Sequence, residues 1–282
     1  MSNAVRIGGQ ALADGVLMRT SRAWAVARDD GTVQVGAVRT GRLRRVPVLR
    51  FLVGLASGMR LAVSRGMLGH GAGRAGGRAR RRNRGFLVTL VGVEAVGIGF
   101  SLLVGHAARS LPATLVVTAV PWVLAFAVLR LATPGSLWRY HGAEHKAVAA
   151  HEAGIPMADV AAVLACPRVH DRCGTNLVFV AMLGALALVA LPAAVQLPAL
   201  LALLAVGAEG VSLAARRPRS PLSRALLVGG RALQRFVTTA EPTAAEQSVG
   251  CRALAACLEH HHRLEGTTPA AVASGAEVPA AA

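Results

Sequence analysis

The chain is short of acidic, aromatic and cysteine residues, and each shortage excludes a class of protein. Of 282 residues, 14 are Asp or Glu against 31 Lys or Arg, which gives a formal net charge of +17. Aromatic residues make up 4%, with a single Tyr, so the stacking platforms of a single-strand nucleic-acid binder are not available. Four cysteines are too few for a disulfide scaffold in a chain of this length. Neither a nucleic-acid partner nor a disulfide-rich fold is therefore expected.

Charged residues are scarce as well, at 16%, while hydrophobic residues reach 54%. A solvated globule of this composition would lack the polar surface to cover itself, which argues against an ordinary soluble enzyme. Four apolar stretches have about the 17 to 25 residues that a helix needs to cross hydrocarbon. They lie at 86–104, 111–132, 177–195 and 199–215 and pair into two hairpins. We therefore expect a mainly α, polytopic helical membrane protein with about four transmembrane helices and a small N-terminal β-hairpin region.

Lys and Arg are distributed unevenly around these stretches. Arg109 is the only basic residue in the two short connections, and the others lie in 1–85, 130–176 and the tail from 216. The positive-inside rule then predicts a multi-pass protein of the bacterial cytoplasmic (inner) membrane, with both termini cytoplasmic. The arginine-rich stretch at 69–85 favours the lipid bilayer and its anionic headgroups as partners. Glu94 and Glu209 lie within the apolar stretches, where a carboxylate is either functional or protonated and paired.

Composition divides the rest of the chain. Alternating residues at 22–28 and 32–38, around a turn at 29–31, predict a β-hairpin. Residues 47–64 suit an interfacial helix better than a fifth crossing, and Thr243 with Glu246 forms a capping box that opens a tail helix. The expected organisation is an N-terminal cytoplasmic region at 1–67, a basic flexible linker at 68–85, hairpins at 86–132 and 177–215, a cytoplasmic loop at 133–176, a helical tail at 216–265 and a disordered end at 266–282.

One block carries the chemistry. His141 and His145 lie four residues apart and project from one face of a helix, a spacing that suits a single metal ion. With Glu144 they form the H-x-x-E-H order of the inverzincin metallopeptidases, whose Glu is the general base. About 25 residues later, His170 and Cys173 add two ligand types that Zn²⁺ favours. The sequence therefore predicts a divalent metal site with zinc as the favoured ion. The same ligands also suit Fe²⁺ or Co²⁺.

The number of ligands decides what Glu144 does. Four protein ligands close the shell and make the metal structural, and Glu144 then orients a histidine. Three ligands leave a position for water, from which Glu144 takes a proton while Lys146 or Arg172 steadies the developing oxyanion. Alternative ligands are the carboxylates of Glu152 and Asp171.

Several segments together resemble the YqhQ family of bacterial multi-spanning membrane proteins of unknown function, often labelled predicted metal-dependent enzymes. The resemblance rests on 8–19, 140–146, 170–175 and parts of 233–242. It implies a membrane protein with these His and Cys residues as the metal site. Asp14 stands where the family pattern has Glu, and Asp171 where it has Pro. The segment Gly8-Gly9-Gln10 either lets the backbone approach the site, with Gln10 or Asp14 donating polar groups, or forms a tight turn.

Three functions follow. The first is a metal-dependent membrane enzyme, a hydrolase or peptidase acting on a peptide or amide bond. The second is a non-enzymatic adaptor or scaffold, in which the metal staples the 134–176 loop and the N-terminal hairpin into a docking surface for a cytoplasmic protein partner. The third is a transporter that uses Glu94 and Glu209.

Overall fold

A four-stranded antiparallel sheet opens the chain in the computed structural model, which describes residues 5–38, 88, 92, 110–188, 191–217 and 219–266. The strands are β1 (Gly8–Leu12), β2 (Gly15–Arg19), β3 (Ala23–Arg28) and β4 (Val33–Ala37), in the order β1-β2-β3-β4. β3 and β4 meet at the turn that the sequence indicates, where Gly31 has a φ of 86° and the Asp30 carboxylate accepts the Thr32 N–H at 2.9 Å. A second hairpin, β1–β2, extends the sheet beyond the one expected.

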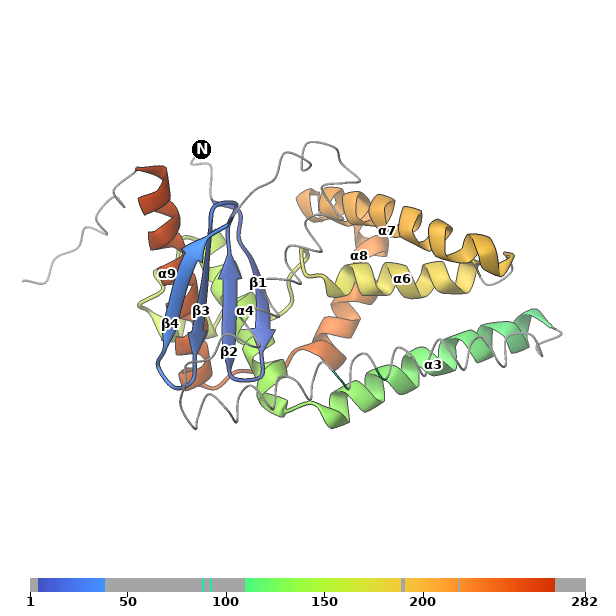
Figure 1. The fold of residues 1–282 in the computed structure, drawn as a ribbon, viewed down its shortest axis with the longest axis horizontal. Helices are drawn as coiled ribbons and strands as arrows, with labels where there is room; N and C mark the ends of the chain where they lie inside the picture. The colour runs from blue at the N-terminus through green and yellow to red at the C-terminus, as the bar shows by residue number, and fades with distance from the viewer. Residues whose placement is uncertain are drawn as a thin grey trace, which may run out of the picture.

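Two helices cover one face of this sheet. α4 (Gly135–Glu152) packs against β1 and β2, and α9 (Ala244–Glu265) packs against β2, β3 and β4 (Figure 1). The capping box of Thr243 and Glu246 is present, and Gly266 ends α9 with a φ of 69°. Buried apolar residues of β2, β3, α4 and α9 form one core, which includes Val16, Tyr140 and Leu254. α4 therefore lies beside α9 on this face, with its other contacts to β1 and β2.

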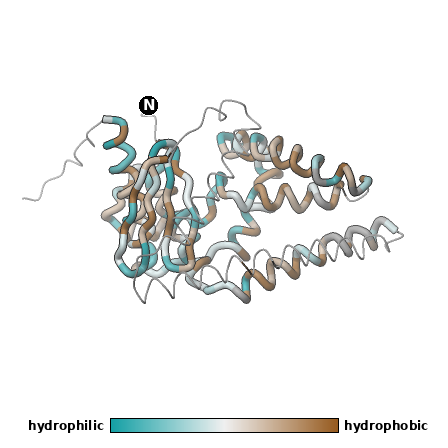
Figure 2. Tube along the Cα trace, viewed as in Figure 1, coloured by the Kyte–Doolittle hydropathy of each residue, from teal (hydrophilic) through white to brown (hydrophobic). Residues whose placement is uncertain are grey.

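The other helices lie beyond this core. They are α3 (Leu111–Ala132), α5 (Val160–Leu164), α6 (Thr175–Leu188), α7 (Ala193–Arg216), α8 (Pro221–Leu233) and the π-helical turn η3 (Gln234–Thr238). α3, α6 and α7 extend away from the sheet (Figure 1) and are largely apolar along their length (Figure 2). α6 and α7 pack closely, because Gly184 leaves room for the side chain of Leu203. α8 packs against both of them.

The expected mainly α, four-span polytopic fold is wrong. Within the described part of the chain, one helix, Ala194–Arg216, is long and apolar enough to cross a membrane. A second such span requires joining Ala119–Leu131 to Gly135–Glu152 across a bend of 97°. α6 is shorter than a span, and the sheet is a substantial part of the fold. Hydropathy reports how apolar a segment is, whereas helix length and bends depend on where the chain turns.

The turn between the last two apolar stretches also lies elsewhere than expected. The sequence places it at 196–198, but α7 begins at Ala193 and continues through Pro198. Pro192 is the N-cap residue, so the chain breaks there instead. The apolar stretch at 86–104, the interfacial helix at 47–64 and the linker at 68–85 lie outside the described residues, apart from Val88 and Gly92.

Candidate metal site

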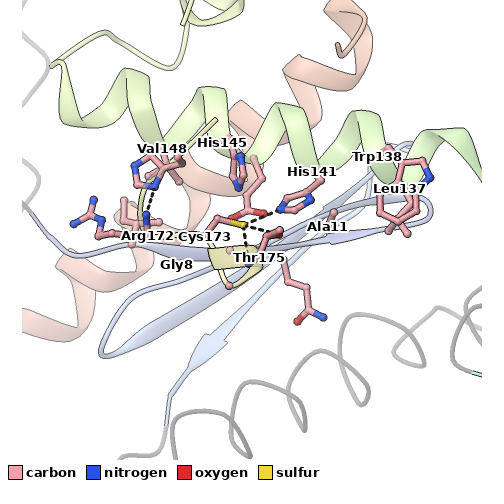
Figure 3. A pocket seen from close by; sticks show the side chains of 16 residues that line it. Gly8, Ala11, Leu137, Trp138, His141, His145, Val148, Arg172, Cys173 and Thr175 are labelled. Carbon is pink, nitrogen blue, oxygen red and sulfur yellow. Dashed lines mark hydrogen bonds between the residues drawn. The ribbon is translucent and has the colours of Figure 1, made fainter. Parts of the chain in front are cut away.

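Three side chains from α4 and from the loop before α6 converge in one place. His141, His145 and Cys173 each offer one ligand atom, and these atoms lie within 4.8 Å of one another. The two imidazoles come from one face of α4, with ring centroids 4.4 Å apart. Cys173 comes from the loop before α6, and its Sγ lies 3.4 Å from His141 Nε2 (Figure 3). Two His and one Cys at these separations can hold a metal ion.

Backbone carbonyls orient both histidines. His141 Nδ1 lies 2.6 Å from the carbonyl oxygen of Thr238, and His145 Nδ1 lies 2.7 Å from that of Arg168. A carbonyl only accepts, so each Nδ1 carries the proton and donates it. The Nε2 lone pair is then the one left for a metal, which is the usual arrangement of metal-binding histidines.

Thr175 gives the sulfur of Cys173 two hydrogen-bond partners, a backbone N–H that donates to it and a hydroxyl oxygen that accepts from it. The backbone N–H of Thr175 lies 3.4 Å from Sγ, and the Thr175 hydroxyl lies 3.3 Å from it. The same hydroxyl lies 3.3 Å from that of Thr238, whose carbonyl accepts from His141. Hydrogen bonds to a cysteine sulfur tune a metal-bound thiolate. Thr175 and Thr238 therefore link the two arms of the cluster.

Glu144 lies in the same pocket. Its carboxylate packs against β1, where a Cβ on Gly9 would come within 2.5 Å of Oε1. Burial raises the pKa of Glu144, and the nearby charges of His141 and His170 oppose that rise. The pocket measures about 310 Å³ and is lined by β1, α4 and the loop at 170–175.

His170 stands apart from the other three candidate ligands. Its Nε2 lies 3.2 Å from Glu152 Oε2, and its ring centroid is 6.1 Å from that of His145. Burial lowers the pKa of His170, while the charges of Glu144 and Asp171 act to raise it. The Asp171 carboxylate is bound at 2.7 Å to Arg231. The structure therefore brings three ligands together rather than four.

The two basic candidates differ in position. Lys146 points away from the cluster, because its Nζ donates to the carbonyls of Leu164 and Cys166 and pairs with Glu241 at 2.6 Å. Arg172 lines the pocket and pairs with Glu152. Burial first, and then the charge of Arg6, lowers the pKa of Arg172. Only Arg172 is placed to meet a ligand in the pocket.

The accessory candidates are scattered. Gln10 lines the pocket, but Asp14 lies in the β1–β2 turn, 2.9 Å from Arg28, and both side chains are 2% exposed. Glu209 lies exposed on α7, away from the pocket lining. Glu94 lies outside the described residues.

The backbone segment that orients His141 was not predicted from the sequence. The carbonyl of Thr238 reaches His141 because Ala240 crosses α4 at Gly142, where a Cβ would meet the Ala240 oxygen. The Ala240 N–H then donates to the Trp138 carbonyl at 2.8 Å. Gly142, between the two histidines, is the signal that could have indicated a close backbone crossing.

A model of one protein family matches most of the helical part of the chain. Residues 106–260 match a family described as a protein of unknown function (DUF1385). No curated protein and no solved structure matches the chain. The matched region contains all three residues of the cluster and Glu144, whereas the sheet precedes it.

Proposed function

The chain belongs to the DUF1385 family, and we propose that it is a metal-dependent hydrolase whose site is His141, His145 and Cys173 with Glu144. The observation that carries the proposal is the convergence of three ligand atoms, two of them on histidines oriented through Nδ1, beside a buried carboxylate. Structural zinc sites are usually closed by four ligands, whereas catalytic ones have three and an open position. The three-ligand set therefore favours catalysis.

Zinc is the proposed ion, because His and Cys donors suit it, and a bound Zn²⁺ acidifies water and polarises a carbonyl. The chain's own contribution is proton transfer. Glu144 accepts a proton from the attacking water, whose oxygen bonds to the carbonyl carbon of an amide. The C–N bond then breaks, and Glu144 delivers the proton to the leaving nitrogen. Arg172 is placed to bind the substrate rather than to handle the proton.

A membrane location is a second part of the proposal, in line with the YqhQ resemblance. Large apolar side chains are exposed on α3 and α7, such as Leu131 at 85% and Val206 at 69%. Soluble monomers rarely expose contiguous apolar surface of this kind. Arg130 and Arg216 lie in the last turns of these helices, where they suit anionic headgroups. Extraction of bacterial membranes with alkaline carbonate tests this, since a chain that partitions into the aqueous supernatant contradicts it.

The metal-stapled adaptor is the competing function. It is favoured by the connections of the cluster, since His141 and Cys173 tie α4 to the start of α6, and His141 contacts Thr238 directly while Cys173 does so through Thr175. A staple predicts that Glu144→Gln leaves function intact and that His145→Ala or Cys173→Ala abolishes it. A hydrolase predicts that Glu144→Gln keeps the metal and loses the activity.

Elemental analysis of the purified protein tests the site itself. We expect about one equivalent of metal per chain, lost in His141→Ala and in Cys173→Ala. His151→Ala, on the same helix, and Cys251→Ala, in the apolar core of α9, are the matched controls and keep the metal. Metal that remains in both cluster variants would refute the site.

A further inference from the structure

β1 forms one wall of the pocket, and it is an edge strand. Among the described residues, β2 is the strand that pairs with it. Residues 7–11 line the pocket together with His141, Glu144 and Cys173. An edge strand presents N–H and C=O groups that its own sheet does not use. The proposed hydrolytic residues therefore lie beside a sheet edge that can accept a further strand.

Small residues keep this edge accessible. Gly8 and Gly9 are exposed, and a Cβ on Gly8 would meet no atom of the described residues within 4 Å. Figure 3 shows Gly8 and Ala11 along the strand, with Cys173 and His141 beside the stretch between them. Gly8 to Ala11 spans about 10 Å at 3.3 Å per residue. That length accommodates the residues on both sides of one amide bond.

The part of the pocket that runs along residues 7–11, called the groove below, differs in chemistry between its two ends. Arg172 lies toward the Gly8 end, whereas Leu137 and Trp138 lie beyond Ala11 (Figure 3). The Arg172 side chain is 44% exposed, and its charge is paired with that of Glu152. The positive charge of Arg6 also acts on Arg172, so this end carries more positive than negative charge. One end of the groove therefore attracts negative charge, and the other is apolar.

We propose, on the premise of the hydrolase function above, that the substrate is an extended polypeptide that adds to β1 as an antiparallel strand. Every strand pair of this sheet is antiparallel, and antiparallel pairing is slightly the more stable arrangement. Because β1 runs from Gly8 to Leu12, the C-terminal side of such a substrate lies at the Arg172 end. The cleaved bond is thus preceded by an apolar residue and followed by an acidic one. Main-chain hydrogen bonds supply affinity, and the two ends supply specificity.

Three blocked octapeptides test the binding mode with the zinc-loaded protein. The first has two leucines before and two glutamates after its central amide bond, the second has the reverse order, and the third is the first with alternate backbone amides N-methylated. A hydrogen bond to a charged group contributes about 1.5–3 kcal/mol, and 1.4 kcal/mol is tenfold. We therefore expect kcat/KM for the first peptide to exceed each of the others by at least about tenfold.

Two further measurements locate the contacts. Arg172→Gln is expected to raise KM for the acidic peptide by about tenfold and to abolish its preference over a peptide with glutamines in place of the glutamates. Arg263→Gln, an exposed arginine on α9, is the matched control and keeps that preference. In Glu144→Gln loaded with zinc, the first peptide is expected to slow hydrogen exchange in β1 and not in β4, the opposite edge of the sheet.

Ester and peptide hydrolysis together distinguish a failure of strand addition to β1 from a failure of the hydrolase function. Glu144-dependent hydrolysis of 4-nitrophenyl acetate, with no preference among the three peptides, overturns the strand-addition mode and leaves the hydrolase standing. Equal protection of β1 and β4 from exchange overturns it too. If the zinc-loaded protein hydrolyses neither the ester nor any peptide in a Glu144-dependent way, the hydrolase function itself is refuted.

Discussion

Gly9→Ala is the substitution that most directly tests the placement of Glu144. A Cβ at this position would lie 2.5 Å from Glu144 Oε1 and 2.6 Å from both Cδ and Cγ. Ordinary van der Waals contact begins at about 3.4 Å, so the carboxylate or the strand must move by about 0.9 Å. Overpacking of this kind costs about 1–3 kcal/mol, and misplacement of a catalytic group by about 1 Å costs on the order of 100-fold in rate.

We therefore expect Gly9→Ala to lower kcat by about 100-fold while metal content stays near that of the wild type. The three atoms nearest to this Cβ all belong to Glu144 and none to a ligand. The assay is ester hydrolysis at saturating substrate, with elemental analysis and thermal melting of the same samples. Gly210→Ala on α7, where the added Cβ meets Leu226 at an ordinary 3.7 Å, is the control. A Gly9→Ala protein with wild-type kcat would refute the argument that packing against Gly9 positions the Glu144 carboxylate for catalysis.

Three other predictions concern groups around the site. Asp14→Asn removes the carboxylate charge beside a guanidinium that is 2% exposed, so urea unfolding should show a loss of about 3–5 kcal/mol. Burial raises the pKa of Cys257 to about 12, and its thiolate is therefore rare at pH 8. Mass spectrometry after iodoacetamide treatment should find Cys257 unmodified in the folded protein and Cys173 modified only once a chelator has removed the metal. Lys146→Met should lower the free energy of unfolding by about 1.5–3 kcal/mol, because Lys146 donates hydrogen bonds to backbone carbonyls. These carbonyls lie outside the pocket, so kcat should stay unchanged. A large loss of kcat at unchanged stability would contradict this.

Local periodicity explains why part of the site was predictable. Residues three and four apart share one face of a helix, so the order of His141, Glu144 and His145 places them together wherever α4 packs. The capping box at Thr243 and the turn at Asp30 depend likewise on neighbouring residues. Such features need no knowledge of the rest of the chain.

The choice between His170 and Cys173 was not predictable in this way. Both lie in one short loop, yet only Cys173 reaches the histidines of α4, while His170 pairs with Glu152 and its N–H donates to Gln234. A loop has no repeating geometry, so the side chain that enters the cluster depends on partners far away in sequence. The same is true of the carbonyls that orient the two histidines.

The four-span expectation failed for a related reason. Hydropathy identified apolar segments, but it does not report the bend between α3 and α4, the break at Pro192 or the pairing of β1 with β2. By itself the sequence determined the residue types of the candidate metal site, the shared helix face of its two histidines and the basic, apolar character of the chain, because these depend on composition and on contacts within a few residues. Only the tertiary structure decided that the candidate ligands number three and that Gly9 of an edge strand lies against Glu144, because these contacts join residues that are not neighbours in sequence: His141 and Cys173 are 32 positions apart, and Gly9 and Glu144 are 135 apart.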